Sequence, residues 1–300
     1  MALRDILVCL DPTDAGEHRL RLAAAIAREH QAHLSAAYVM TEEIAGAAPY
    51  GDLGIAAPAG AAGLAEGSLV AGMPAPQIPP APNADTTRGA ALADIIEQRY
   101  RETVRPNDID GDWHLFGSGE AADLVTLVKT VDLVVYGQSS SDYRAPSGFR
   151  PEDIITACGR PMLVVPYAGN FAAIGRRALI AWDGTREATR ALHDAVPLLG
   201  KAEAVMVVTV RAREASFDRD PPGLDRIVRH LERHGIAARA EHTLQGDMPV
   251  SDVLLSRATD FDADLIVAGA YHHSQFREAL LGGVSRELLA HMTAPVLMSH

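Results

Sequence analysis

The sequence predicts an α/β protein built from two tandem doubly wound domains, each with a parallel sheet covered by helices on both faces. The first observation is an internal repeat, in which RDILVCLDPT (4–13) matches RRALIAWDGT (176–185) without a gap. Further along the chain, DLVVYG (132–137) matches DLIVAG (264–269). The second observation is that nearly continuous apolar runs alternate with amphipathic segments between these anchors, which is typical of βαβ units.

The second half, residues 173–300, shows this alternation most clearly. We expect strands at 178–182, 204–210, 237–244, 264–269 and 295–299. We expect helices between them at 185–199, 223–235, 250–260 and 277–291. These segments are sufficient for one complete doubly wound domain.

The first half, residues 1–172, repeats this order and is about 40 residues longer between its anchors. We expect its helices at 17–30, 89–104, 121–129 and 151–158. The extra residues form an insertion at about 42–87 that is rich in Ala, Gly and Pro and shows no sustained period. Such a segment cannot bury a core of its own, so it is either a functionally idle surface excursion or a lid over the ligand crevice of the first half.

The composition excludes several classes of protein. A formal net charge of -12 argues against a protein that neutralises nucleic-acid phosphates or lies on an anionic membrane. The two cysteines cannot form a disulfide framework, and no run of apolar residues is long enough to span a membrane. The first residues lack the pattern of a signal peptide, so we expect a cytoplasmic protein.

Candidate site residues lie after the first and fourth strands of the second half, where an open α/β sheet collects ligands. The first group is Asp183, Gly184 and Thr185, which hydrogen-bond a nucleoside or simply cap the next helix. Gly269 lets the chain turn off the fourth strand. The last group opens a helix whose positive end favours an anion, and it consists of Gly282, Gly283, Val284 and Ser285.

These residues and the paired openings ILVCLDPT and LIAWDGT resemble the universal stress protein family, in a form with two UspA-type domains in one chain. The resemblance covers nearly everything outside the insertion and implies the strand order 3-2-1-4-5 in each domain. It also implies an ATP or related adenine-nucleotide site, with Asp183 near adenine and ribose. Nucleotide-binding members have a glycine where His272 stands, and Gly283 replaces their Ser or Thr.

His272 either prevents this loop from binding a nucleotide or takes part in the binding. A histidine is costlier than glycine if the backbone requires a positive φ, and its ring crowds the phosphates or donates a hydrogen bond to one. In the first half, Ser140 stands three residues after Gly137, and no glycine pair opens the last helix. We therefore expect a degenerate phosphate loop in the first domain.

A metal site at His272 and His273 is disfavoured, because neighbouring side chains point apart and no carboxylate stands at ligand spacing. No base or nucleophile is recognisable for phosphoryl transfer, so we expect a sensor or carrier with at most slow ATP hydrolysis. The rival hypothesis is a scaffold for an unknown protein partner, in which both nucleotide sites are relics. A hydrolase or transferase on the same fold is a weaker third hypothesis.

The closing strands PMLVV and PVLMS are predicted to be sheet edges that need a partner. In the family resemblance, these edges pair two domains about a twofold axis. A tandem chain can make this pairing within itself as a pseudo-dimer, either alone or within a homodimer.

Overall fold

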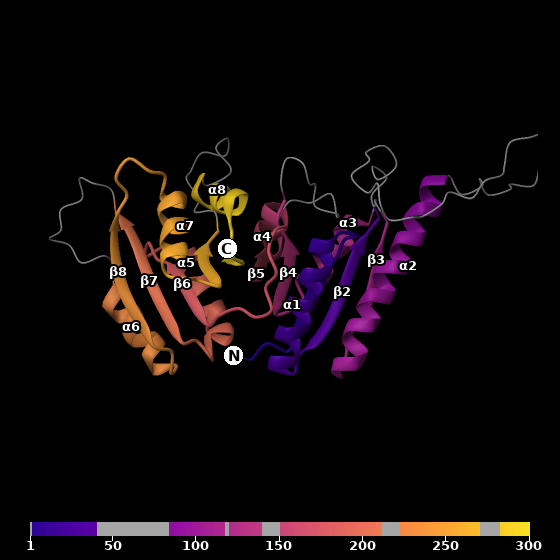
Figure 1. Ribbon diagram of the computed structural model, residues 1–300, viewed down its shortest axis with the longest axis horizontal. Helices are drawn as coiled ribbons and strands as arrows, with labels where there is room; N and C mark the ends of the chain where they lie inside the picture. The colour runs from indigo at the N-terminus through magenta and orange to yellow at the C-terminus, as the bar shows by residue number, and fades with distance from the viewer. Residues whose placement is uncertain (1, 41–83, 118–119, 140–150, 212–222, 271–282) are drawn as a thin grey trace, which may run out of the picture.

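All of the described strands join in one sheet. The computed structural model describes residues 2–40, 84–117, 120–139, 151–211, 223–270 and 283–300. In these residues ten strands follow the order β3-β2-β1-β4-β5-β10-β9-β6-β7-β8 (Figure 1). The strands are β1 Asp5–Cys9, β2 His33–Val39, β3 Trp113–Phe116, β4 Leu133–Gly137, β5 Met162–Val165, β6 Arg177–Ala181, β7 Ala204–Arg211, β8 Ala238–Leu244, β9 Leu265–Gly269 and β10 Val296–Ser299. Each half therefore has the predicted order 3-2-1-4-5, and the fold class is confirmed.

Helices cover both faces of this sheet. They are α1 Asp14–His30, α2 Ala84–Val104, α3 Ala121–Val128, α4 Pro151–Cys158, α5 Arg186–Ala195, α6 Leu224–Arg233, α7 Val250–Asp260 and α8 Gly283–His291. Apolar side chains of α1, α2, α5 and α6 pack together on one face, and those of α3, α4, α7 and α8 pack on the other. Each apolar layer runs through both halves, so the two repeats share their core.

The halves meet where β10 pairs antiparallel with β5. Leu297 lies opposite Leu163 in this seam, while the strands within each half run parallel. Gln138, directly after β4, reinforces the seam from the first half. Its side-chain Nε2 donates hydrogen bonds to the carbonyls of Leu289 (2.8 Å) and Ala290 (3.1 Å) in α8.

The repeated Asp that precedes β4 and β9 has the same structural role in both halves. Asp132 accepts a hydrogen bond from the backbone N–H of Arg4 at 2.8 Å, and Asp264 accepts one from Gly175 at 2.8 Å. Each carboxylate thus ties the start of the fourth strand of its half to the segment that enters the first strand. This shared role explains why the repeated segments DLVVYG and DLIVAG both begin with Asp.

Two predicted helix bounds need correction, and a third lies partly outside the described residues. Helix α2 begins at Ala84 and passes through Gly89, because a single glycine inside a helix costs only about 1 kcal/mol. Helix α5 ends at Ala195, and residues 196–199 form a 3-10 turn because Pro197 lacks the N–H that would continue the helix. Helix α8 is described from Gly283, and residues 277–282 of its predicted span lie outside the described residues.

Candidate functional site

The turn after β6 is held by its own side chains. Asp183 Oδ1 accepts hydrogen bonds from Thr185 N (3.0 Å) and Thr185 Oγ1 (2.6 Å). Thr185 in turn is the N-cap of α5, and its Oγ1 accepts from Ala188 N at 3.2 Å. Gly184 has a φ of 80°, which a residue with a side chain rarely adopts. Asp183 itself remains exposed.

The carboxyl end of β9 lies beside this turn, because β9 and β6 are neighbours in the sheet. A Cβ atom added to Gly269 would lie 2.5 Å from Ala188 N and 2.9 Å from Glu187 Cβ. The glycine is therefore required by the close approach of the first turn of α5. The sequence predicts that Gly269 allows a sharp turn of the chain, whereas the structure shows that it makes room for α5.

The start of α8 completes the site. Ser285 is buried and its hydroxyl donates a hydrogen bond to the carbonyl of Gly269 at 3.4 Å. Gly283 and Val284 are exposed, and a Cβ added to Gly283 would meet no atom within 4 Å. The structure thus brings Thr185, Gly269 and Ser285 together at the ends of β6 and β9.

His272 and Gly282 of the predicted site lie outside the described residues, as do Ser140 and most of the insertion at 42–87. In the part of the chain that is described, no group of three His, Cys, Asp or Glu side chains is placed to hold a metal ion. None of the described helices is both long and apolar enough to cross a membrane.

Glu187 lies next to Gly269 at the candidate site and was not among the residues predicted from the sequence. It lies in the first turn of α5, its side chain is only 6% exposed, and Arg186 Nε is 3.4 Å from its Oε1. The positive end of the helix favours a carboxylate at this position. The sequence does show an acidic residue two positions after the Thr185 cap. Acidic residues are common in the first turn of a helix, so this position alone did not indicate a site.

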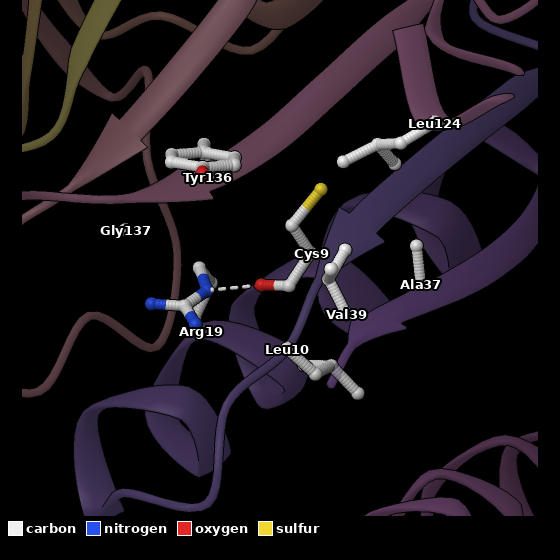
Figure 2. Close-up of a pocket in the computed structure, with 8 residues that line it drawn as sticks. All are labelled: Cys9, Leu10, Arg19, Ala37, Val39, Leu124, Tyr136 and Gly137. Carbon is white, nitrogen blue, oxygen red and sulfur yellow. Dashed lines mark hydrogen bonds between the residues drawn. The ribbon is translucent and has the colours of Figure 1, made fainter. Parts of the chain in front are cut away.

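The equivalent crevice of the first half is filled by its own side chains. Asp11, which matches Asp183 in the repeat, forms a buried ion pair with Arg19 of α1, and the Asp11 side chain is 0% exposed. Arg19 Nε also donates a hydrogen bond to the carbonyl of Cys9 at 2.8 Å (Figure 2). A Cβ atom on Gly137 would overlap Arg19 Nη1. The guanidinium group therefore lies across the ends of β1 and β4, where the sheet order reverses.

A small cavity lies beside this ion pair among the described residues. Its volume is about 10 Å³, enough for roughly one water molecule. Figure 2 shows Cys9 and Tyr136 lining it from neighbouring strands and Leu124 lining it from α3. Burial raises the pKa of the Cys9 thiol to about 12 and outweighs the opposing effect of the nearby Arg19 charge. The thiol is therefore protonated at neutral pH and suits a core position.

One position explains why the two Asp residues of the repeat differ in exposure. Thr13 and Thr185 cap α1 and α5 in the same way, so Arg19 in the first half matches Ala191 in the second. Ala191 is fully buried and has no group that could reach Asp183. The repeated sequence contained this difference, but only the structure shows that the arginine fills the crevice.

Comparison with known proteins identifies this arrangement. Residues 175–300 match the family model described as the universal stress protein family. The second half is a universal stress protein domain. No curated protein sequence matches the chain significantly.

Solved structures extend the universal stress protein fold to the whole chain. A universal stress protein from Archaeoglobus fulgidus DSM 4304 has a TM-score of 0.66 and 13% identity, covering 98% of this chain and 95% of that chain. A protein of unknown function from Pseudomonas aeruginosa PAO1 has a TM-score of 0.55 and 16% identity, covering 99% and 92%. A universal stress protein in complex with cAMP covers 56% of this chain and 100% of its own, with a TM-score of 0.34 and 16% identity.

Proposed function

We propose that this protein binds one adenine nucleotide per chain and acts as a sensor or regulator in a stress response. The contrast between the exposed Asp183 and the buried Asp11 carries the proposal. A ligand can reach the carboxylate of the second half without breaking an ion pair. In the first half it would have to displace Arg19, which leaves a buried charge without its partner at high cost.

Each part of the second-half crevice suits one part of such a ligand. Asp183 accepts hydrogen bonds from the nucleoside, while Gly184 and Thr185 shape the turn beneath it. The N-terminal turn of α8, with Gly283, Val284 and Ser285, presents backbone N–H groups and a positive helix end to phosphate oxygens. His272 and Gly282 belong to the same proposed loop, and Gly269 lets α5 approach it.

The proposal is for binding and signalling, with at most slow ATP hydrolysis. We place the protein in the cytoplasm, where its two buried free cysteines would stay reduced. The signal would pass to a protein partner, as expected for a regulator without an evident reaction of its own.

A scaffold without a nucleotide is the second candidate, and three contacts favour it. Gly269 is required by the packing of α5, Ser285 donates to Gly269, and Asp183 holds the capping residue Thr185. These residues would therefore be useful to the fold even if no ligand ever bound.

Native mass spectrometry of the purified protein, followed by calorimetry with ATP and AMP, separates the two candidates. We expect one nucleotide per chain. Asp183→Ala should weaken binding by about tenfold or more, because a hydrogen bond to a charged group contributes about 1.5–3 kcal/mol. Asp94→Ala, which removes an exposed carboxylate from α2, is the matched control and should leave affinity unchanged. Absence of binding at millimolar nucleotide would favour the scaffold, and two nucleotides per chain would contradict a closed first half.

A further inference from the structure

Three histidines from two helices form a cluster on the second half. His193 lies on α5, and His230 and His234 lie one helical turn apart on α6 and its C-cap. The ring centroids of His193 and His230 are 5.0 Å apart, and those of His230 and His234 are 4.7 Å apart. His230 is thus the central ring, with His193 of α5 and His234 of the α6 C-cap as its two neighbours. We call these three residues the histidine cluster.

The surroundings of His230 disfavour a positive charge. Its Nε2 is buried and has no hydrogen-bond partner among the described residues. Burial lowers the pKa of His230 below its ordinary value of 6.5, and the neighbouring His193, His234 and Arg233 lower it further. The groups that face it are therefore cationic or become so in acid.

No carboxylate acts on His230 within the described structure to offset these charges. Asp194, the nearest acidic residue to His193 along α5, is engaged by Arg190 at 2.8 Å. His193 uses its own Nδ1 in a 2.8 Å contact with the carbonyl of Thr189. Among the described residues, the histidine cluster therefore has no carboxylate that offsets a proton on His230.

Helix α6 packs next to the edge strand β8 of the sheet. Its Leu224 and Leu231 are fully buried in the apolar layer shared with α5. The strand after it, β8, is the last of the sheet and pairs with β7 alone. Loosening α6 would expose these leucines and leave β8 without its helical cover.

We propose that the histidine cluster is an acid-sensitive latch that holds α6 against α5 when its rings are neutral and releases α6 when they become protonated. A histidine whose folded-state pKa is lowered takes up a proton more readily in the unfolded chain. The stabilising effect of neutral His230 is therefore complete well above pH 6.5 and is lost as the pH falls through and below that value. Charges on adjacent rings would add repulsion.

Thermal unfolding of the full-length protein from pH 8 to pH 5 tests the latch. His230→Gln removes the titrating ring and keeps a polar side chain. We expect the melting temperature of the wild type to fall between pH 7.5 and pH 5 by about 2–4 °C more than that of His230→Gln. His242→Gln, an exposed histidine on β8 outside the cluster, is the matched control and should behave as the wild type.

Hydrogen exchange locates the effect. At pH 5.5 the amides of α6 should lose protection before those of α7 in the wild type, and the variant should lack this difference after correction for intrinsic rates. If His230→Gln does not fold, His193→Gln removes an exposed member of the histidine cluster and should show the same reduced acid sensitivity. Identical pH profiles for the wild type and the folded variants would overturn the latch. Stabilisation by one equivalent of Zn²⁺ at pH 7.5 that disappears in His230→Gln would replace it with a metal site.

Discussion

Arg19 is the residue that most clearly separates the two halves. It lies in α1 at the position where α5 has Ala191, and its guanidinium group contacts the carboxylate of Asp11 and the carbonyl of Cys9. Both members of the ion pair are buried. A buried pair of this kind contributes little compared with a well-packed apolar pair, but removing one partner is costly.

We expect Arg19→Met to destabilise the protein by about 3–5 kcal/mol, because Asp11 would be left buried and charged without a counter-ion. Urea unfolding followed by circular dichroism measures this loss. Replacing both partners, with Asp11→Leu and Arg19→Met together, should recover part of it.

Arg21→Met is the matched control for Arg19→Met on the same helix. Arg21 pairs with Glu17 one turn away, and its side chain is 53% exposed. Its loss should cost no more than about 0.5 kcal/mol. Similar costs for the two arginine variants would mean that water reaches the Asp11 carboxylate.

At the scale of elements, α8 is held at both ends by contacts distant in sequence. Ser285 joins its first turn to Gly269, and Gln138 of the first half binds the carbonyls of its last turn. Gln138 is buried, and its Oε1 also accepts a hydrogen bond from Tyr167 N at 3.2 Å. The position of this helix therefore depends on both halves.

Gln138→Leu should loosen α8 without removing its apolar packing. It leaves the buried carbonyl of Leu289 and the partly buried carbonyl of Ala290 without this donor, at a cost of about 1–3 kcal/mol. Hydrogen exchange should show faster opening of α8 and little change in α2. If hydrogen exchange became faster in α2 by as much as in α8, the substitution would have caused a general loss of stability.

Much at this scale could be predicted from the sequence. Strands such as β4 were predicted because both of their faces are buried, which produces a continuous apolar run. Contacts such as the reach of Arg19 across Gly137, or the packing of α5 on Gly269, could not be predicted. They join residues far apart in the chain. The sequence also does not show whether a glycine is needed for the approach of a helix or for the approach of a phosphate.

For the whole molecule, the shared sheet and the two shared apolar layers predict a single unfolding transition. The chain has two tryptophans, Trp113 in β3 and Trp182 after β6, so each half carries its own fluorescent reporter. Trp113→Phe and Trp182→Phe isolate the signals.

Within each single-tryptophan variant, fluorescence and circular dichroism should show the same urea midpoint. Adding Leu163→Ala, in the seam strand β5, should lower stability by about 2–5 kcal/mol as seen by either tryptophan. If it shifted only the Trp113 signal, the halves would be unfolding independently.

The antiparallel seam of β5 and β10 has a consequence for how the protein can change. In an assembly of identical copies, symmetry makes every substitution appear in each copy. Here the two repeats are covalently joined and encoded separately, so a substitution appears once. Arg19 can therefore fill the crevice of one half while Asp183 stays exposed in the other, and each half can acquire substitutions that the other does not share.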